Sequence, residues 1–167
     1  GVSDAQLFLL RMGLIKQAEM VTRGYTDLAE RYKCGEARGF AWNNLGINLL
    51  CQGRLEEAHN YVSDSLELDP YDRNDPDKRI PRLNKADILA TMGDWENALQ
   101  MCDTCTQDIE SSSRLWCKVW RIRALSAEAR DDTGRAQECG RYMMSILERS
   151  NCPIRDWTIL RRLGVIA

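Results

Sequence analysis

The chain has 167 residues, of which 44% are hydrophobic and 29% charged, and its formal net charge is −2 at pH 7. This composition supports one domain with a hydrophobic core and excludes a disordered chain. No apolar run approaches the roughly 20 residues that a membrane helix needs, and no signal peptide is visible. The acidic balance disfavours nucleic acid as a partner, so the arginines of the C-terminal third are expected on a solvated helix surface.

A fixed spacing recurs along most of the chain. Gly13, Gly53 and Gly93 lie 40 residues apart, and an alanine follows each by five positions, in the segments GLIKQA, GRLEEA and GDWENA. Apolar residues at helical spacing precede and follow these glycines. Each glycine is predicted to end one helix in the left-handed conformation, and a second helix is predicted to begin directly after it. The pattern indicates an array of helical hairpins.

In chain order, the hairpins are expected at residues 1–34, 39–72, 79–112 and 117–152, followed by a final helix at 153–167 that Pro153 opens. The first hairpin lacks most of its first helix. The fourth hairpin fits only with three residues inserted in the turn RDDTGR, which puts Gly134 and Cys139 at the glycine and alanine positions. Residues 68–79 are interpreted as a loop between hairpins, with Pro70 past the end of a helix. The prediction is a single all-α domain over residues 1–167.

Residues 39–72 closely resemble a tetratricopeptide repeat. The family pattern is Trp-x2-Leu-Gly-x2-Tyr, then Ala-x3-Phe, then Pro. The matching residues here are Trp42, Leu45, Gly46, Leu49, Ala58, Val62 and Pro70. The spacing of about 40 residues resembles the longer-period variety of the family. The resemblance implies a right-handed superhelix of about four helix–turn–helix repeats plus a C-terminal helix, in which the first helices line a concave groove.

The family binds proteins and peptides in this groove, and the resemblance implies the same use here. The residues that it places in the groove are Asn43, Asn44, Ile47, Leu50, Asn84, Asp87, Lys118, Arg121 and Leu125. Asn44 and Asn84 hold the same place in consecutive repeats. An asparagine can hydrogen-bond both edges of an extended peptide, although asparagine is also simply common there. Lys118 and Arg121 would select an acidic residue. The family's clamp for chaperone tails is matched only in part and is not predicted.

Few residues offer catalysis or metal binding. His59 is the only histidine and is expected on a helix surface. Cys102 and Cys105 form a CxxC pair in mid-helix without a second pair, so they are expected to fill the core; a redox or metal role is the alternative. The acidic run at 68–79 lacks the glycine and glutamate of a calcium loop. No enzyme activity, cofactor or metal is predicted.

The sequence therefore predicts a scaffold or adaptor that binds a protein or peptide partner in the concave groove. The alternative is a ligand-sensing or oligomerising region of a multidomain signal-responsive regulator, such as a transcription factor or a signalling ATPase. The partial first hairpin and the unpaired last helix suggest a fragment of a longer protein, and open repeat ends allow self-association. Seven irregularly spaced cysteines favour reduced thiols and a cytoplasmic location.

Overall fold

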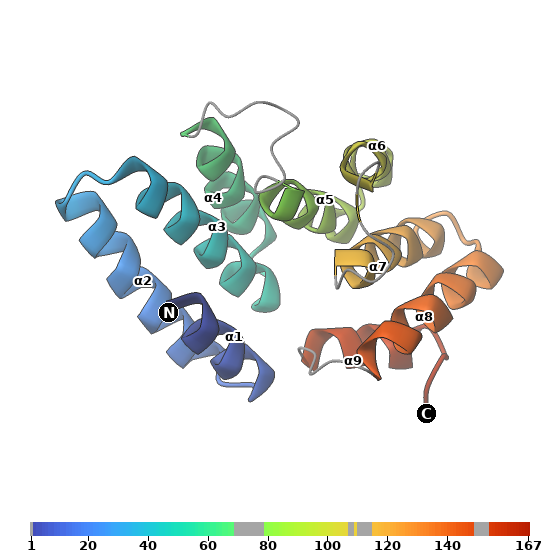
Figure 1. Cartoon of the computed structure of the whole chain (residues 1–167). Helices are drawn as coiled ribbons and strands as arrows, with labels where there is room; N and C mark the ends of the chain where they lie inside the picture. Colours follow the sequence, from blue (N-terminus) through green and yellow to red (C-terminus); the bar gives the residue numbers. More distant parts are fainter. Residues whose placement is uncertain (1, 69–78, 107–108, 110–114, 149–153) are drawn as a thin grey trace. The chain divides into compact units, whose positions relative to one another are not determined.

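The computed structural model describes residues 2–68, 79–106, 109, 115–148 and 154–167. Within these ranges the regular structure is entirely helical, with nine α-helices and no strand (Figure 1). The predicted all-α fold class is therefore confirmed. Three of the predictions fall wholly or partly outside the described residues. They concern the loop at 68–79 with Pro70, the ends of the second to fourth hairpins, and Pro153.

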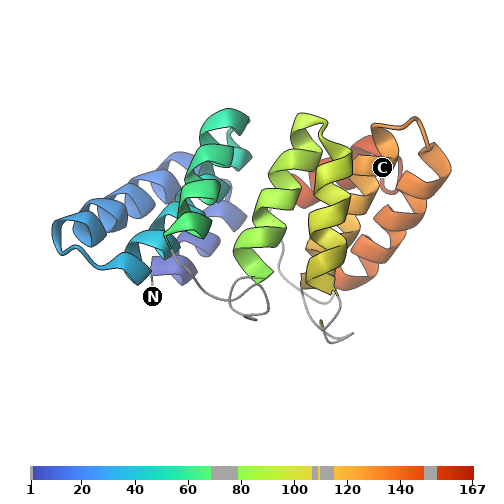
Figure 2. The same ribbon diagram turned by 90° about the horizontal axis from the view of Figure 1, so that it is seen from above.

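Consecutive helices pair as four hairpins, and a single helix follows them. The pairs are α1 (Val2–Arg11) with α2 (Ile15–Arg31), α3 (Gly35–Cys51) with α4 (Leu55–Glu67), α5 (Arg79–Met92) with α6 (Trp95–Thr106), and α7 (Leu115–Glu128) with α8 (Thr133–Leu147). The last helix is α9 (Ile154–Arg162). Figures 1 and 2 show these pairs from two directions. The predicted hairpins plus a C-terminal helix are thus present.

The helices gather into two compact units, residues 1–84 and 85–167. In the first unit α2 packs on both α1 and α3, and α3 packs on α4. In the second unit α7 packs on both α6 and α8, and α9 adds Leu160 to a core cluster with Cys117, Met143 and Leu147. Whether the chain behaves as one domain, as its sequence suggests, stays a prediction.

The first three hairpin turns each contain the predicted glycine in the left-handed conformation. The φ angles are 73° at Gly13, 76° at Gly53 and 91° at Gly93. A residue with a Cβ is strained at such angles, which is why glycine recurs there. The alanines that follow by five positions, Ala18, Ala58 and Ala98, are fully buried. Each turn therefore brings a small side chain into the contact between the two helices of its hairpin.

The fourth turn differs from its prediction. Its left-handed residue is Asp131, with φ 59°, whereas Gly134 lies inside α8. Ala136 follows Asp131 by five positions and is 1% exposed, so it holds the alanine position that was assigned to Cys139. The predicted three-residue insertion is therefore wrong. Aspartate tolerates the left-handed region, and a search for glycine alone overlooks it.

The two helices of the second hairpin approach closely at Gly46. A Cβ built on Gly46 would lie 2.3 Å from Val62 Cγ2 and 3.1 Å from the Ala58 carbonyl oxygen. The same two positions in the third hairpin are Ala86 and Cys102, both fully buried. A larger residue on the first helix is thus matched by a smaller one on the second.

The paired cysteines lie in the core, as predicted. Cys102 and Cys105 are 0% and 4% exposed, in the positions that Val62 and Ser65 hold in the second hairpin. Burial raises the pKa of the Cys102 thiol to about 12. A thiol that stays protonated is neither a good nucleophile nor a ready metal ligand.

Candidate functional site

The predicted groove residues all lie on first helices of the hairpins, on α3, α5 and α7. Most of them are buried: Asn43, Leu50, Asn84, Asp87, Arg121 and Leu125. Asn44, Ile47 and Lys118 are partly exposed. The structure therefore divides the set into side chains that hold helices together and side chains that reach the surface.

Two asparagines form equivalent hydrogen bonds between successive first helices. Asn44 Nδ2 donates to Ser3 Oγ at 2.9 Å, which joins α3 to α1. Asn84 Nδ2 donates to Asn43 Oδ1 at 2.9 Å, which joins α5 to α3. Both bonds span 41 residues, so the same link recurs one repeat further along. The Asn43–Asn84 bond is buried, and two of the predicted groove residues thus satisfy one another.

A buried ion cluster joins α5, α7 and α9 within the unit of residues 85–167. Arg121 Nε and Nη2 donate to Asp87 Oδ2 at 3.1 Å and 2.6 Å, and Arg121 Nη1 donates to Asp156 Oδ1. All three side chains are buried. Burial disfavours the charged guanidinium, but Asp156 and Asp87 outweigh it and raise the pKa of Arg121 well above its ordinary value. Arg121 is therefore permanently charged and already paired.

Asp156 is a member of this cluster that the sequence did not reveal. Its only sequence signal is an acidic side chain in the first turn of the last helix. An acidic residue at that place commonly stabilises the helix dipole and need not pair with a distant cation. The partner Arg121 lies 35 residues earlier, and only the packing of α9 brings the two together.

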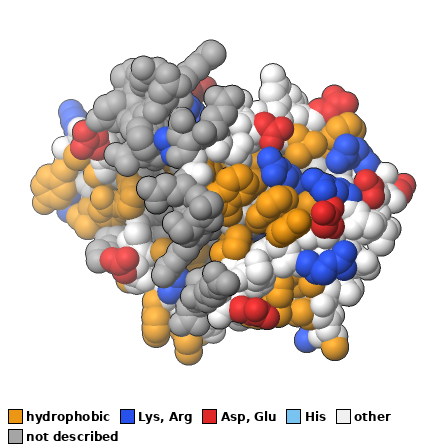
Figure 3. Space-filling view, turned by 45° about the vertical axis from the view of Figure 1, so that its right-hand side comes forward, with side chains coloured by type: hydrophobic (Ala, Val, Ile, Leu, Met, Phe, Trp, Pro, Cys, Tyr) orange, Lys and Arg blue, Asp and Glu red, His pale blue; other side chains and the backbone are white. Residues whose placement is uncertain are grey.

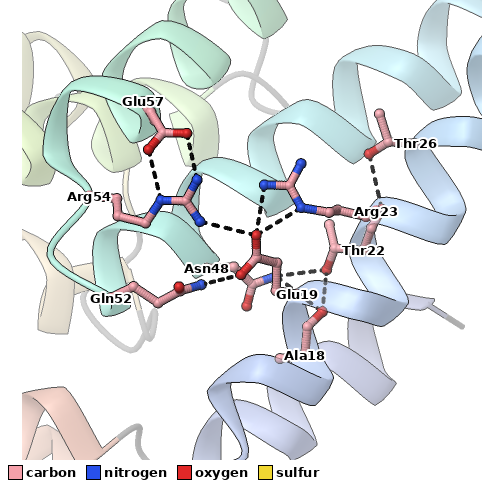
Figure 4. Close-up of polar contacts among 9 residues, drawn as sticks. All are labelled: Ala18, Glu19, Thr22, Arg23, Thr26, Asn48, Gln52, Arg54 and Glu57. Atoms are coloured by element: carbon pink, nitrogen blue, oxygen red, sulfur yellow. Dashed lines mark hydrogen bonds and ion pairs between the residues drawn. The ribbon is translucent and has the colours of Figure 1, made fainter.

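A second polar network in the unit of residues 1–84 surrounds Glu19 of α2 (Figure 4). Its carboxylate accepts hydrogen bonds from Arg23 Nε at 2.8 Å, Gln52 Nε2 at 2.7 Å and Arg54 Nη1 at 3.3 Å. Arg54 also pairs with Glu57 at the start of α4. The hydrogen bond from Gln52, helped by the two arginines, keeps the pKa of Glu19 below its usual value despite partial burial. The network ties α2 to the turn between α3 and α4.

Aromatic side chains stack at the surface of α7 and α8. The ring centroids of Trp120 and Tyr142 lie 4.6 Å apart, and those of Trp120 and Trp116 lie 5.9 Å apart. The Arg123 guanidinium lies 5.2 Å from the Trp120 ring and pairs with Asp103 at 3.0 Å. Figure 3 shows one face of the molecule, where hydrophobic side chains lie beside basic and acidic ones.

The described residues contain neither a cluster of metal ligands nor a helix that could span a membrane. No group of three or more His, Cys, Asp or Glu side chains in those ranges could hold a metal ion. His59 is partly buried on α4. None of the described helices combines the length and the apolarity that crossing a membrane requires.

Comparison with known proteins agrees with the helical hairpins. The family model described as "Tetratricopeptide repeat" matches residues 39–72. Among solved structures, the chain resembles one titled "MamA RS-1 ArsTM double mutant", a tetratricopeptide-type protein. The TM-score is 0.52 at 12% identity, over 98% of this chain and 93% of that one, so the likeness concerns the fold. No curated protein sequence matches the chain. The chain is therefore a helical-repeat protein in which residues 39–72 match a tetratricopeptide repeat.

Proposed function

We propose that the chain is a non-catalytic protein-interaction module that holds an extended peptide of its partner along α3. Tetratricopeptide repeats generally mediate contacts between proteins, which supports the broad class of function. The proposed contacts are Asn44 and Ile47, because these are the partly exposed members of the predicted set on α3. Arg121 is left out as a selector of acidic residues, since Asp87 and Asp156 already occupy its guanidinium.

The hydrogen bonding of the Asn44 side chain is the observation on which this proposal rests. Its Nδ2 is held by Ser3 Oγ at 2.9 Å, while its Oδ1 has no hydrogen-bond partner among the described residues. The amide is thus oriented and retains an acceptor for a backbone N–H of a bound peptide. Ile47 lies three residues on, which places it on the same side of the helix and offers an apolar contact for a neighbouring side chain. An oriented side chain loses little entropy on binding.

Capture of partners by the purified chain tests the proposal, with proteins quantified by mass spectrometry and each recovered peptide then titrated against the variants. Asn44→Ala combined with Ile47→Ser is expected to weaken binding about tenfold or more, because one hydrogen bond and one apolar contact together are worth about 1–3 kcal/mol. The matched control is Asn60→Ala, an exposed asparagine on α4. Asn84→Ala is avoided because it would break the buried bond to Asn43.

The opposite binding result for the variants would refute the assignment of the partner contact to α3. If the partner binds the Asn44 and Ile47 double variant as tightly as the natural chain and loses affinity for Asn60→Ala, the contact lies on the second helices. Circular dichroism on each variant separates lost binding from lost folding.

A further inference from the structure

Two side chains near the start of α3 contain buried hydrogen-bond donors that have no acceptor. The donors are Arg38 Nε and Trp42 Nε1, and neither has a partner among the described residues. A donor that is buried without an acceptor destabilises the fold, and the indole N–H of a buried tryptophan usually finds a partner. The two side chains are neighbours, because the Arg38 guanidinium lies 5.2 Å from the centre of the Trp42 ring. The pair therefore offers hydrogen bonds that the described chain does not use.

This pair lies on the side of α3 between α2 and α4. Both of these helices pack on α3 (Figure 1). Arg38, Trp42 and Gly46 follow one another at intervals of four, which places them in one row along α3. Gly46 faces α4, whereas Asn48 donates hydrogen bonds to α2. Since each residue turns the helix by about 100°, Arg38 projects about midway between the directions of Gly46 and Asn48.

The positive charge of Arg38 has no counter-ion among the described residues. Arg38 forms no hydrogen bond or ion pair with any of them, and this includes Glu30 and Glu36, the acidic residues nearest to it in the sequence. Its place near the start of α3 is also unfavourable for a cation, because the helix dipole is positive there. Its Nη groups are not among the buried atoms, so a ligand can reach them from the surface. The side chain is thus a charged donor group that is open to an anion.

The fourth hairpin shows that covering this tryptophan does not require an arginine. The corresponding residues there, 78 positions on, are Trp116 and Trp120. Their ring centroids lie 5.9 Å apart, so an aromatic side chain takes the place that the guanidinium takes in the second hairpin. An aromatic pair is attracted about as strongly as a cation over a ring, and Trp116 leaves no buried donor without a partner. The packing of α3 alone therefore does not account for Arg38.

We propose that Arg38 and Trp42 bind a carboxylate on an acidic side chain of a protein partner. One guanidinium matches the single negative charge of a carboxylate, whereas a phosphate group carries nearly two charges. The two carboxylate oxygens can accept hydrogen bonds from the guanidinium fork and from the indole N–H. Rotation of the flexible Arg38 side chain brings its Nε, and the indole that it covers, into contact with the ligand.

This contact goes beyond the peptide contact at Asn44, because it uses another side of α3. Trp42 and Asn44 are two positions apart, so their side chains project about 160° apart around the helix. A carboxylate at Arg38 and a peptide at Asn44 therefore do not compete for one surface. The chain would then connect two partners, or two segments of one partner.

NMR spectroscopy of the isotope-labelled natural chain tests the proposal, with N-acetylglutamic acid α-amide as the carboxylate probe. The indole N–H resonance of Trp42, assigned by its loss in Trp42→Phe, and the Nε–H resonance of Arg38 are expected to shift until the site is saturated. The uncharged N-acetylglutamine amide should shift neither resonance. Arg38→Lys should weaken binding about threefold or more, because lysine lacks the planar fork. Arg38→Trp should abolish binding and keep the helix content, because it reproduces the natural pair Trp116 and Trp120.

Lys16→Gln is the matched control, since Lys16 is exposed near the start of α2 and the change removes the same charge. It should bind the probe like the natural chain, and so should Asn44→Ala, which lets this proposal and the peptide proposal fail separately. The absence of a saturable shift, equal shifts with the two amides, or unchanged binding by Arg38→Trp would overturn the inference. A response to inorganic phosphate without a response to the glutamic acid amide would also overturn it, because the ligand would not be a carboxylate.

Discussion

Gly46 shows how one residue sets the distance between two helices. Its missing Cβ leaves space that Val62 of α4 occupies, and the Ala58 carbonyl closes the other side. The third hairpin combines Ala86 with Cys102 at the same positions, and the fourth combines Ala124 with Gly140. The second, third and fourth hairpins thus use different residue pairs at this contact, but in each pair the combined side-chain volume is small. Each residue identity depends on its counterpart about 16 positions away along the chain.

Gly46→Ala is expected to lower the free energy of unfolding by about 1–2 kcal/mol. Overpacking against Val62 costs about 1–3 kcal/mol, and the better helix propensity of alanine returns up to about 1 kcal/mol. Adding Val62→Cys should recover most of the loss, because it reproduces the natural pair Ala86 and Cys102. Urea denaturation at constant m-value measures both changes. A single variant as stable as the natural chain, or a double variant no better than the single, would contradict the close contact.

The sequence predicts single residues well where the requirement is local. Gly13, Gly53 and Gly93 are correctly placed, because a left-handed backbone excludes most side chains whatever surrounds the turn. The same rule does not find Asp131, because aspartate is tolerated in the left-handed conformation but is not required for it. A pattern that admits aspartate or asparagine at the turn position would have placed α8 correctly.

At the level of helices, polar side chains connect each first helix to the next. Asn44 and Asn84 make the connections from α1 to α3 and from α3 to α5. Arg121 with Asp87 and Asp156 makes those from α5 to α7 and from α7 to α9. The sequence predicts Asn44, Asn84, Asp87 and Arg121 on first helices, in contact with a partner, and assigns no role to Asp156. Their hydrogen bonds join residues 34 to 41 positions apart, so helix periodicity alone could not reveal them.

Arg121→Met is expected to destabilise the unit of residues 85–167 by about 3–5 kcal/mol. It leaves the carboxylates of Asp87 and Asp156 buried without their cation. Asp156→Ala should cost less, because Arg121 keeps its bonds to Asp87. Guanidinium denaturation, followed by the fluorescence of the tryptophans on α7, shows which variant loses more free energy of unfolding. A smaller loss for Arg121→Met than for Asp156→Ala would mean that the cluster does not hold the charges as described.

At the level of the whole molecule, the cysteines report how the chain opens. Cys34 is exposed, whereas Cys102 is fully buried in the unit of residues 85–167. Thiol reagents attack the thiolate, and a pKa of about 12 at Cys102 leaves little of it at neutral pH. Modification of Cys102 therefore requires that this unit opens first.

A thiol reagent is expected to modify Cys34 of the native chain at least about a thousandfold faster than Cys102. Peptide mass spectrometry measures the labelling of each cysteine. In denaturant the two rates should converge, because unfolding removes the burial that raises the pKa of Cys102. Cys34→Ser serves as the control that labelling elsewhere does not open the core. Equal native rates would show that Cys102 is not held in a packed interior.

The sequence by itself determined the helical hairpins, the first three turns and the core positions of Ala58, Cys102 and Cys105. These follow from backbone sterics and the helical period, which act over a few residues. Only the tertiary structure decided that Asn84 and Arg121 bind neighbouring helices while Asn44 keeps an acceptor at the surface. Hydrogen bonding and burial depend on which side chains meet after the hairpins stack, and that information is spread over distant parts of the chain.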